Sequence, residues 1–321
     1  MLARKLLVLL PVVALAGCAQ QDVQVSAAGQ AVASPFYVDP DSNPANWVRA
    51  HPNDPRAAKI RQAVAQRPMG RWFGGWSGDV RKAADRYVAA AQRAGKTPIL
   101  VPYNITDRDC SGHSSGGAGS PARYRAWIGA FAAGIGTRPA VVVLEPDAVA
   151  QIGCLPTEAA RKSRRDLLKH AVNQLKAKAP KAKVYLDGGN AKWHKPADIA
   201  ALMHSAGLKN VRGFALNVSN YFTTADTVKY AKQVNAALSA KYGYTRTFVV
   251  DTSRNGKGGR PGDWCNPAGA KLGTVSQMGG GAEMLLWVKV PGDSDGKCGV
   301  APNTPAGQFS PDLAMRLIDG R

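Results

Sequence analysis

Acidic residues are scarce in this chain, and histidines are scarcer. Its 321 residues include 22 Asp and Glu against 42 Lys and Arg, a formal net charge of +20, and only five histidines. The histidines form no cluster with carboxylates at ligand spacing, so no metal site is expected. The basic balance is typical of proteins with polyanionic partners, but Lys and Arg are spread widely, as on a solvated surface.

Several sequence signatures are also missing. No GxGxxG or GxxxxGK[ST] motif follows an apolar run, which excludes the common nucleotide fingerprints and predicts no cofactor. No GxSxG elbow is present, so a serine-hydrolase mechanism is not indicated. There is no internal repeat and no Pro/Ser/Thr-rich linker. Residues 35–321 are therefore expected to form one large α/β domain.

The N-terminus has the pattern of an export signal. Arg4 and Lys5 precede an apolar run over 6–16 that is too short to cross a bilayer. The run ends in Leu15-Ala16-Gly17-Cys18, which resembles a bacterial lipobox. Residues 1–17 are thus predicted to be a lipoprotein signal peptide, with an ordinary secretory signal as the alternative.

Cys18 is the predicted lipidation site, and the polar, aperiodic residues 18–34 are a predicted flexible tether. These features predict an exported bacterial lipoprotein that touches the membrane through its lipid anchor only. Ala19 lacks the Asp associated with inner-membrane retention, so an outer-membrane destination is expected where the host has one. No later segment approaches the roughly 18 apolar residues of a membrane span.

Four cysteines remain when Cys18 is set aside: Cys110, Cys154, Cys265 and Cys298. An even number in an exported chain predicts two disulfides, and their spacing leaves three connectivities open.

Short apolar segments alternate with helical patterns along the domain. Because this alternation is regular, it predicts a parallel sheet with helices outside, either a barrel or a doubly wound sheet. The predicted strands are 99–105, 140–146, 183–189, 213–218, 247–252 and 284–290, with 35–40 as a seventh, and the predicted helices are 80–94, 121–134, 157–179 and 224–241.

Carboxylates follow successive predicted strands, and this position favours the barrel. The acids are Asp109, Asp147, Asp187, Asp251, Asp293 and Asp295. Acids at the carboxyl ends of barrel strands meet at one mouth. The sequence therefore predicts an α/β fold, a distorted parallel β/α barrel of about seven strands, with its active site at the C-terminal ends of the strands.

A ring of carboxylates with aromatics nearby suits sugar chemistry. Cleavage of a glycosidic bond needs one protonated carboxyl as donor and one carboxylate to activate water or attack. Like-charge crowding raises the pKa of one of them. Tryptophans offer flat apolar faces for pyranose rings, although each could equally belong to the core. The candidates are Trp72, Trp193, Trp264 and Trp287.

Three sequence blocks carry a family resemblance: Tyr103-Asn-Ile-Thr-Asp-Arg-Asp-Cys110, Leu144-Glu-Pro-Asp147 and Trp287-Val-Lys-Val-Pro-Gly-Asp-Ser-Asp-Gly296. Three further blocks match in order between them, at 186–194, 217–224 and 251–258. From about Trp72 to the C-terminus the chain resembles glycoside hydrolase family 6, the inverting cellulases and cellobiohydrolases. The resemblance implies a β-glucan substrate.

The resemblance also implies catalytic roles. Asp147 would be the general acid, and Asp109 would raise its pKa and help to order water. Tyr103 would crowd the sugar at the cleavage site and favour its distortion. Asp295 matches the carboxylate usually proposed as the base, acting directly or through a chain of waters.

A second implied group binds substrate. Trp72, Trp193 and Trp264 match sugar-stacking positions, Asp187 and Lys289 would line the cleft, and Ser115 lies near the water site in a glycine- and serine-rich loop expected to move. The implied substrate-binding set is completed by Asn190, Asn217 and Asp293. Asn190 stands where the family usually has His, and Asp293 where Glu is more common.

The family pattern implies pairing of Cys110 with Cys154 and of Cys265 with Cys298. Connections such as the one between Trp264 and Trp287 look short, which favours an open cleft and endo-cleavage. The alternatives are a related hydrolase of another, acidic envelope polysaccharide, and an inactive glucan-binding lipoprotein. Only net charge favours nucleic acid, so no such partner is expected, and a monomer is the default.

Overall fold

A curled sheet of eight strands forms the centre of the computed structural model, which describes Leu2 and residues 34–321. The order is β1-β2-β3-β4-β5-β6-β8-β7, and all neighbours are parallel except β7 with β8. Apart from Leu2, the predicted signal peptide lies outside the described residues, as does Cys18. The strands are β1 Arg71–Phe73, β2 Ile99–Pro102, β3 Ala140–Leu144, β4 Ala182–Asp187, β5 Gly213–Leu216, β6 Thr247–Asp251, β7 Gln277–Met278 and β8 Met284–Leu286.

Alternating side chains divide the core into two layers, as the pleat of a strand requires. In β3, Val142 and Leu144 belong to the cluster shared with the outer helices, whereas Val141 and Val143 point into the curl of the sheet. All of these side chains are fully buried. Strands covered on both faces explain why the sequence shows continuous apolar runs rather than polar alternation.

The barrel is incomplete, because β1 and β7 remain the two edges of the sheet. Its first and last parts nevertheless meet through two hydrogen bonds. Gly70 N donates to Trp287 O at 2.7 Å, and Trp72 Nε1 donates to Val288 O at 2.9 Å. The predicted distorted parallel β/α barrel is therefore confirmed in the form of a half-barrel.

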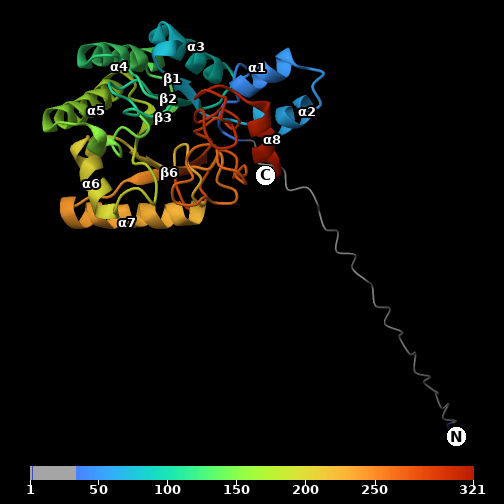
Figure 1. The fold of residues 1–321 in the computed structure, drawn as a ribbon. Helices are drawn as coiled ribbons and strands as arrows, with labels where there is room; N and C mark the ends of the chain where they lie inside the picture. Colours follow the sequence, from blue (N-terminus) through green and yellow to red (C-terminus); the bar gives the residue numbers. More distant parts are fainter. Residues whose placement is uncertain (1, 3–33) are drawn as a thin grey trace. The chain divides into compact units, whose positions relative to one another are not determined.

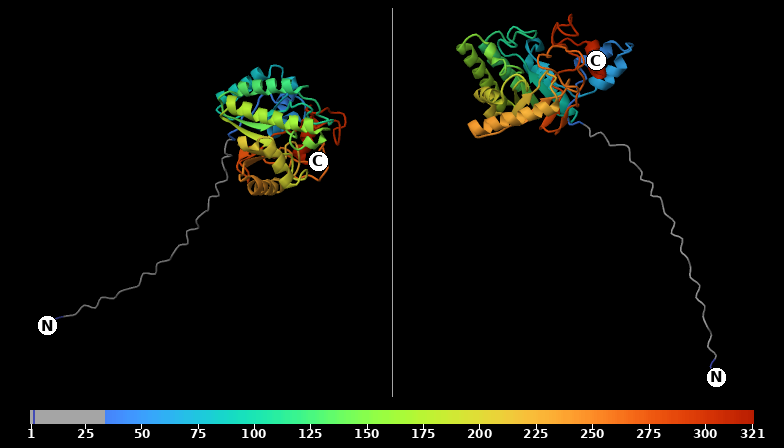
Figure 2. Two further views of the ribbon diagram at one scale, coloured as in Figure 1. Left: turned by 90° about the vertical axis from the view of Figure 1, so that its left-hand side faces the viewer. Right: turned by 60° about the horizontal axis from the view of Figure 1, so that its bottom comes forward.

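Helices cover the convex side of the sheet in chain order from α3 to α7 (Figures 1 and 2). A second, smaller group of α1, α2 and α8 packs together through Val48, Ile60 and Ala314. None of the helices in the described part of the chain combines the length and apolarity needed to cross a membrane. The helices are α1 Asn43–Ala50, α2 Ala57–Ile60, α3 Val80–Arg93, α4 Pro121–Ile135, α5 Glu158–Lys178, α6 Pro196–Ser205, α7 Thr224–Tyr242 and α8 Pro311–Asp319.

The seventh predicted strand was wrong. Residues 35–40 contribute only a single bridge between Phe36 and Thr97, and the additional parallel strand is β1 instead. Strand β1 has only three residues between two glycines, so it is too short to show the alternation of side chains by which a strand is predicted. The other six predicted strands are present, but 99–105 and 284–290 extend beyond β2 and β8 into loops that line a cleft.

One buried cation links the outer helices to these loops. Arg164 of α5 is 2% exposed, although the sequence suggests only a solvated basic helix face. Its guanidinium donates to Thr106 O and Asp107 O at 2.9 Å and to Ala148 O at 3.2 Å. It therefore joins the segment after β2 to the segment after β3.

We expect Arg164→Met to lower the free energy of unfolding by about 2–4 kcal/mol, because three buried carbonyl groups lose their donor. Urea denaturation with the disulfides intact measures the change. Lys162→Met, on the exposed face of the same helix, is the control and should cost less than about 0.5 kcal/mol. Equal stability of the two variants would contradict the assigned role.

Candidate active site

A cleft of about 1280 Å³ lies at the carboxyl ends of the parallel strands. It is lined by the segments after β1, β2, β3, β4, β5, β6 and β8. Every catalytic or substrate-binding residue implied by the family resemblance lines this cleft except Asp187 and Asn217. The structure thus brings together residues that are up to about 220 positions apart in the chain, such as Trp72 and Asp295.

Asp147 lies in a sharp turn after β3, with a left-handed φ of 68°. Its N–H donates to Asp187 Oδ2 at 2.9 Å, which holds the turn against β4. Burial, reinforced by the negative charges of Asp109 and Asp295, raises the pKa of Asp147 to about 7, while Lys289 opposes the rise. The carboxyl can therefore remain protonated near neutrality and donate a proton.

Asp109 is positioned by the loop that carries it. Its Oδ1 accepts from Gln151 Nε2 at 2.9 Å and its Oδ2 from Ser114 N at 2.8 Å. The disulfide between Cys110 and Cys154 joins this loop to the segment after β3, with the two Cα atoms 6.5 Å apart. The predicted pairing therefore fastens the loop of Asp109 to the loop of Asp147.

Glu145, two residues before Asp147, joins the segment after β3 to the segment after β2. Its carboxylate accepts from Asn104 N at 2.9 Å and from Ile105 N at 3.0 Å. Burial raises the pKa of Glu145 to about 7. It is fully buried and lies outside the cleft, so it holds the two segments together and does not contact the substrate.

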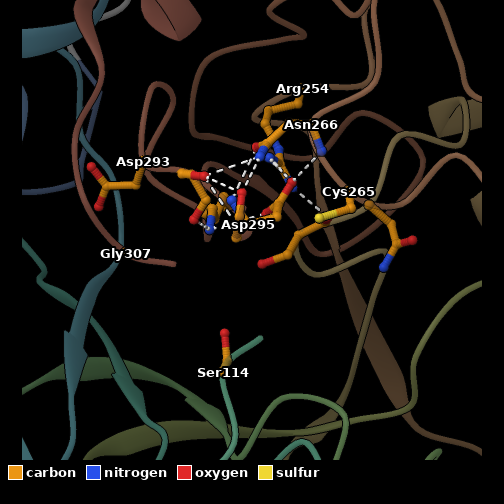
Figure 3. A network of polar contacts seen from close by, with 12 residues as sticks. Ser114, Arg254, Cys265, Asn266, Asp293, Asp295 and Gly307 are labelled. Atoms are coloured by element: carbon orange, nitrogen blue, oxygen red, sulfur yellow. Dashed lines mark hydrogen bonds and ion pairs between the residues drawn. The ribbon is translucent and has the colours of Figure 1, made fainter. Parts of the chain in front are cut away.

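Asp295 lies at the centre of a dense polar network (Figure 3). Its carboxylate pairs with Arg254 at 2.7 Å and with Lys289 at 3.1 Å. The Tyr221 hydroxyl adds a bond of 2.9 Å and Asn266 N one of 3.1 Å. Burial disfavours the charged form of Asp295, but the positive charges of Arg254 and Lys289 outweigh this effect. They hold the pKa of Asp295 well below the usual range. Asp295 is therefore a permanent carboxylate.

Asn266 holds the loop that carries Asp295. Its side chain accepts from Asp295 N at 3.0 Å and donates to Gly296 O at 2.8 Å and to Ser294 Oγ at 3.0 Å. The neighbouring Cys265 forms the second predicted disulfide, with Cys298, at a Cα separation of 5.9 Å. Both ends of this loop are thus tied to the segment after β6.

The tryptophan candidates separate into two groups. Trp193 is 37% exposed and Trp264 52% exposed, and both line the cleft. Trp72 also lines it, edge-on to Tyr103 at 5.1 Å between ring centroids. Trp287 was wrong as a sugar-stacking candidate, because it is 1% exposed and its Nε1 donates to Thr274 O in the core.

Three predicted acids and amides lie behind the cleft. Asn217 was wrong as a substrate contact: it is fully buried, and its amide bonds to Phe222 and Asp251. Asp187 does not line the cleft either, since it faces the turn of Asp147 and the N–H of Gly189. Burial and Asp147 raise the pKa of Asp187 well above its usual range. Asp251 accepts backbone N–H groups and is equally enclosed.

The two departures from the family pattern both reach the cleft. Asn190 bonds to Lys192 N at 3.0 Å and to Asn220 Oδ1 at 3.3 Å. Asp293 Oδ2 accepts a hydrogen bond from Asn43 Nδ2 at 2.8 Å, while Asp293 Oδ1 is buried without a partner. Burial raises the pKa of Asp293 to about 7.

Sequence reasoning missed three residues that line the cleft, namely Trp76, Arg108 and His113. It also missed three residues that bind the carboxylate of Asp295, namely Arg254, Tyr221 and Asn266. Arg108 lies within the quoted block around Asp109, so that block could have identified it. Within residues 34–321, one group has metal-ligand proximity: His113 with Cys265 and Cys298. Both of its sulfurs are bound in the disulfide.

Comparison with known proteins agrees with this geometry. The model of the family "Glycosyl hydrolases family 6" matches residues 30–321. The chain belongs to this family. It is 52% identical to Endoglucanase 1 of Streptomyces halstedii over 286 residues, which cover 89% of this chain and 88% of that protein. It is 44% identical to Endoglucanase A of Thermobispora bispora, over 91% of this chain and 64% of that protein.

A solved structure of the family has the same fold. The endoglucanase Cel6 of Mycobacterium tuberculosis, in complex with methyl-cellobiosyl-4-deoxy-4-thio-β-D-cellobioside, matches with a TM-score of 0.81 and 37% identity. The match covers 90% of this chain and 98% of that one. The family resemblance stated from the sequence motifs is confirmed.

We expect the Asp147 carboxyl to titrate near pH 7, and Asp109→Asn to move this titration to lower pH by about one unit. The reason is that the variant removes a negative charge that stabilises the protonated form. Carbon-13 NMR of the aspartate carboxyls measures both, with Asp147→Asn identifying the resonance. An unchanged titration in Asp109→Asn would contradict the electrostatic coupling.

Proposed function

We propose that this chain is an endo-acting hydrolase that cleaves β-1,4-glucan with inversion and uses Asp147 as its general acid. One observation carries the proposal: a carboxyl with a pKa of about 7 and a permanent carboxylate, Asp295, line one aromatic-walled cleft. A pair of carboxyl groups in opposite charge states is what acid-assisted glycosidic cleavage requires. The chain is a cellulose-type glycoside hydrolase by family membership, and the two relatives compared above are named endoglucanases.

In this mechanism Asp147 protonates the glycosidic oxygen as the bond to the anomeric carbon breaks. Asp109 keeps that proton available through its charge and helps to order water. Tyr103 lies under the cleavage site, where burial and Asp147 raise the pKa of its phenol well above the ordinary range. It therefore stays neutral, crowds the sugar and favours a distorted ring.

Asp295 acts on the water side. Its low pKa makes it a weak base, so it is unsuited to removing a proton from free water. A water that has begun to bond to the cationic anomeric carbon is far more acidic, and a weak base suffices at that stage. Arg254 and Lys289 keep the carboxylate ionised and oriented until then. A proton relayed through a second water fits the same geometry.

We expect Asp147→Asn to lower activity on carboxymethylcellulose and mixed-linkage β-glucan by about 10²–10⁴-fold, since general-acid catalysis contributes that much. The full chain is used, and reducing ends and viscosity are followed together. Asp85→Asn on the exposed side of α3 is the matched control and should keep wild-type activity. An active Asp147→Asn variant would remove this residue as the acid.

The same reaction mixture tests the other two parts of the proposal. Endo-cleavage requires viscosity to fall early, before many reducing ends appear. Inversion requires that the first sugar released, observed by proton NMR, carries the α configuration. A first product with the β configuration would point to retention and to a covalent intermediate.

An acidic polysaccharide substrate is a weaker alternative. The net charge of +20 motivates it, but the cleft itself is not basic. Its charged lining consists of Arg71, Arg86, Arg108, Lys192, Arg260 and Lys289 against Asp39, Asp41, Asp109, Asp147, Asp263, Asp293 and Asp295. The excess positive charge therefore lies elsewhere on the chain, and a neutral glucan suits the cleft better.

We also propose that the enzyme is exported and anchored to the cell envelope through lipidated Cys18, on the sequence pattern of residues 1–18. Cys18→Ala should abolish incorporation of labelled fatty acid and move the protein out of the membrane fraction. The measurement is metabolic labelling followed by fractionation of expressing cells. Membrane retention of the variant without a label would argue against a lipid anchor at this residue.

A further inference from the structure

Trp76 is an exposed tryptophan of the cleft for which the mechanism has no use. It is 60% exposed, more than Trp193 or Trp264, and it lines the cleft on the segment that follows β1. An aromatic ring left this open to water forgoes the gain that burial would bring. Its exposed face instead adds to the aromatic lining that Trp193 and Trp264 give to the same cleft.

The indole is held in one orientation. It belongs to a tight turn, Gly75–Ser77, in which Gly74 N donates to Ser77 Oγ at 3.1 Å. Its six-membered ring packs directly on Gly74, where a Cβ atom would lie 2.4 Å from the ring carbons. A side chain at position 74 would displace the ring, so the indole contacts the Gly74 backbone on one side while it stays open to water.

Arg108 fixes the ring from a second direction. Its guanidinium carbon lies 5.2 Å from the Trp76 centroid and 4.6 Å from that of Tyr103. The guanidinium is itself anchored, since it donates to Tyr103 O at 2.8 Å and to Ser114 O at 2.7 Å. Trp76 is thus connected through one buried cation to the tyrosine at the proposed cleavage site.

We propose that Trp76 is the stacking platform of an outer subsite, which takes one glucosyl unit of a longer β-1,4-glucan chain. A β-glucosyl ring presents a flat face of C–H groups with its hydroxyls at the rim, and a rigid, solvent-open indole matches that face. Ser77 and Arg86, which also line the cleft, offer polar partners for the hydroxyls at the rim. This inference rests on the proposed glucanase function and adds a chain-length preference to it.

The test compares kcat/KM for cello-oligosaccharides of increasing length in the full-length protein. Trp76→Ala should match the wild type on the shortest oligosaccharide that is cleaved. On longer oligosaccharides it should be about three- to tenfold lower, mainly through KM, as expected for one lost aromatic contact. Trp76→Phe should recover much of the difference, because it keeps an aromatic face.

Two further variants sharpen the comparison. Gly74→Ala keeps Trp76 but displaces its indole ring, because the added Cβ would collide with it. This variant should therefore show the same loss of kcat/KM, confined to long oligosaccharides. Met278→Ala removes another exposed apolar side chain, 49% exposed and outside the cleft, and should change nothing at any length.

A role for Trp76 as mere support of Arg108 gives a different result. It would lower kcat equally on short and long substrates and shift the pH profile, because the Asp109 loop would move. Such a result, or equal activity of Trp76→Ala and wild type at every length, overturns the proposal.

A binding measurement keeps the inference separate from the proposed function. Calorimetry with the Asp147→Asn protein compares oligosaccharide affinity with and without the additional Trp76→Ala change. A loss of affinity confined to long oligosaccharides supports the outer subsite even if the wild type proves inactive on cellulose derivatives, in which case the proposed reaction fails and the subsite stands. No loss of affinity at any length overturns it.

Discussion

The charge of Asp295 is the interaction on which the rest of the site depends. A buried carboxylate is costly unless it is paired and fully hydrogen-bonded, and Arg254, Lys289, Tyr221 and Asn266 together satisfy it. Burial makes ionisation of Asp147 unfavourable, and the charges of Asp109 and Asp295 add to this effect. The negative charge of Asp295 thus helps to keep the proton on Asp147, although Lys289, which pairs with Asp295, acts in the opposite direction.

Holding like charges close together needs a rigid frame. The turns that carry Asp109, Glu145 and Asp147 all contain left-handed backbone, with φ between 47° and 68°. Conformations of this kind cost of order 1–3 kcal/mol each and persist where the surroundings over-determine them. Here the surroundings are the Cys110–Cys154 disulfide, the Glu145 carboxylate and the buried guanidinium of Arg164.

Contacts across the cleft complete the frame. His113, on the loop of Asp109, packs against Gly296 so closely that a Cβ there would lie 2.4 Å from its ring, and its centroid is 5.9 Å from that of Trp264. The loop that carries Asp109 therefore contacts the loop that carries Asp295. Arg108 donates a hydrogen bond within the loop of Asp109 and also contacts Trp76, so it links this loop to the proposed outer subsite.

Sequence patterns predicted those parts of the molecule that depend on near neighbours in the chain. Six of the strands were visible because buried parallel strands are short apolar runs, and Asp147 and Asp109 were visible because they belong to compact motifs. The three-residue strand β1 and the two-residue β7 were not predicted, since neither is long enough to show a period. Asn217 belongs to a matching motif as well, yet its amide is used within the loop itself.

The sequence by itself determined the α/β class, the family and the acids that follow the strands. Tertiary structure alone decided which of those acids is charged, because Arg254 and Lys289 reach Asp295 from the segments after β6 and β8. It also decided that Trp287 is core whereas Trp76 is surface. Burial and charge are sums over neighbours in space, and those neighbours are brought together only when the sheet curls.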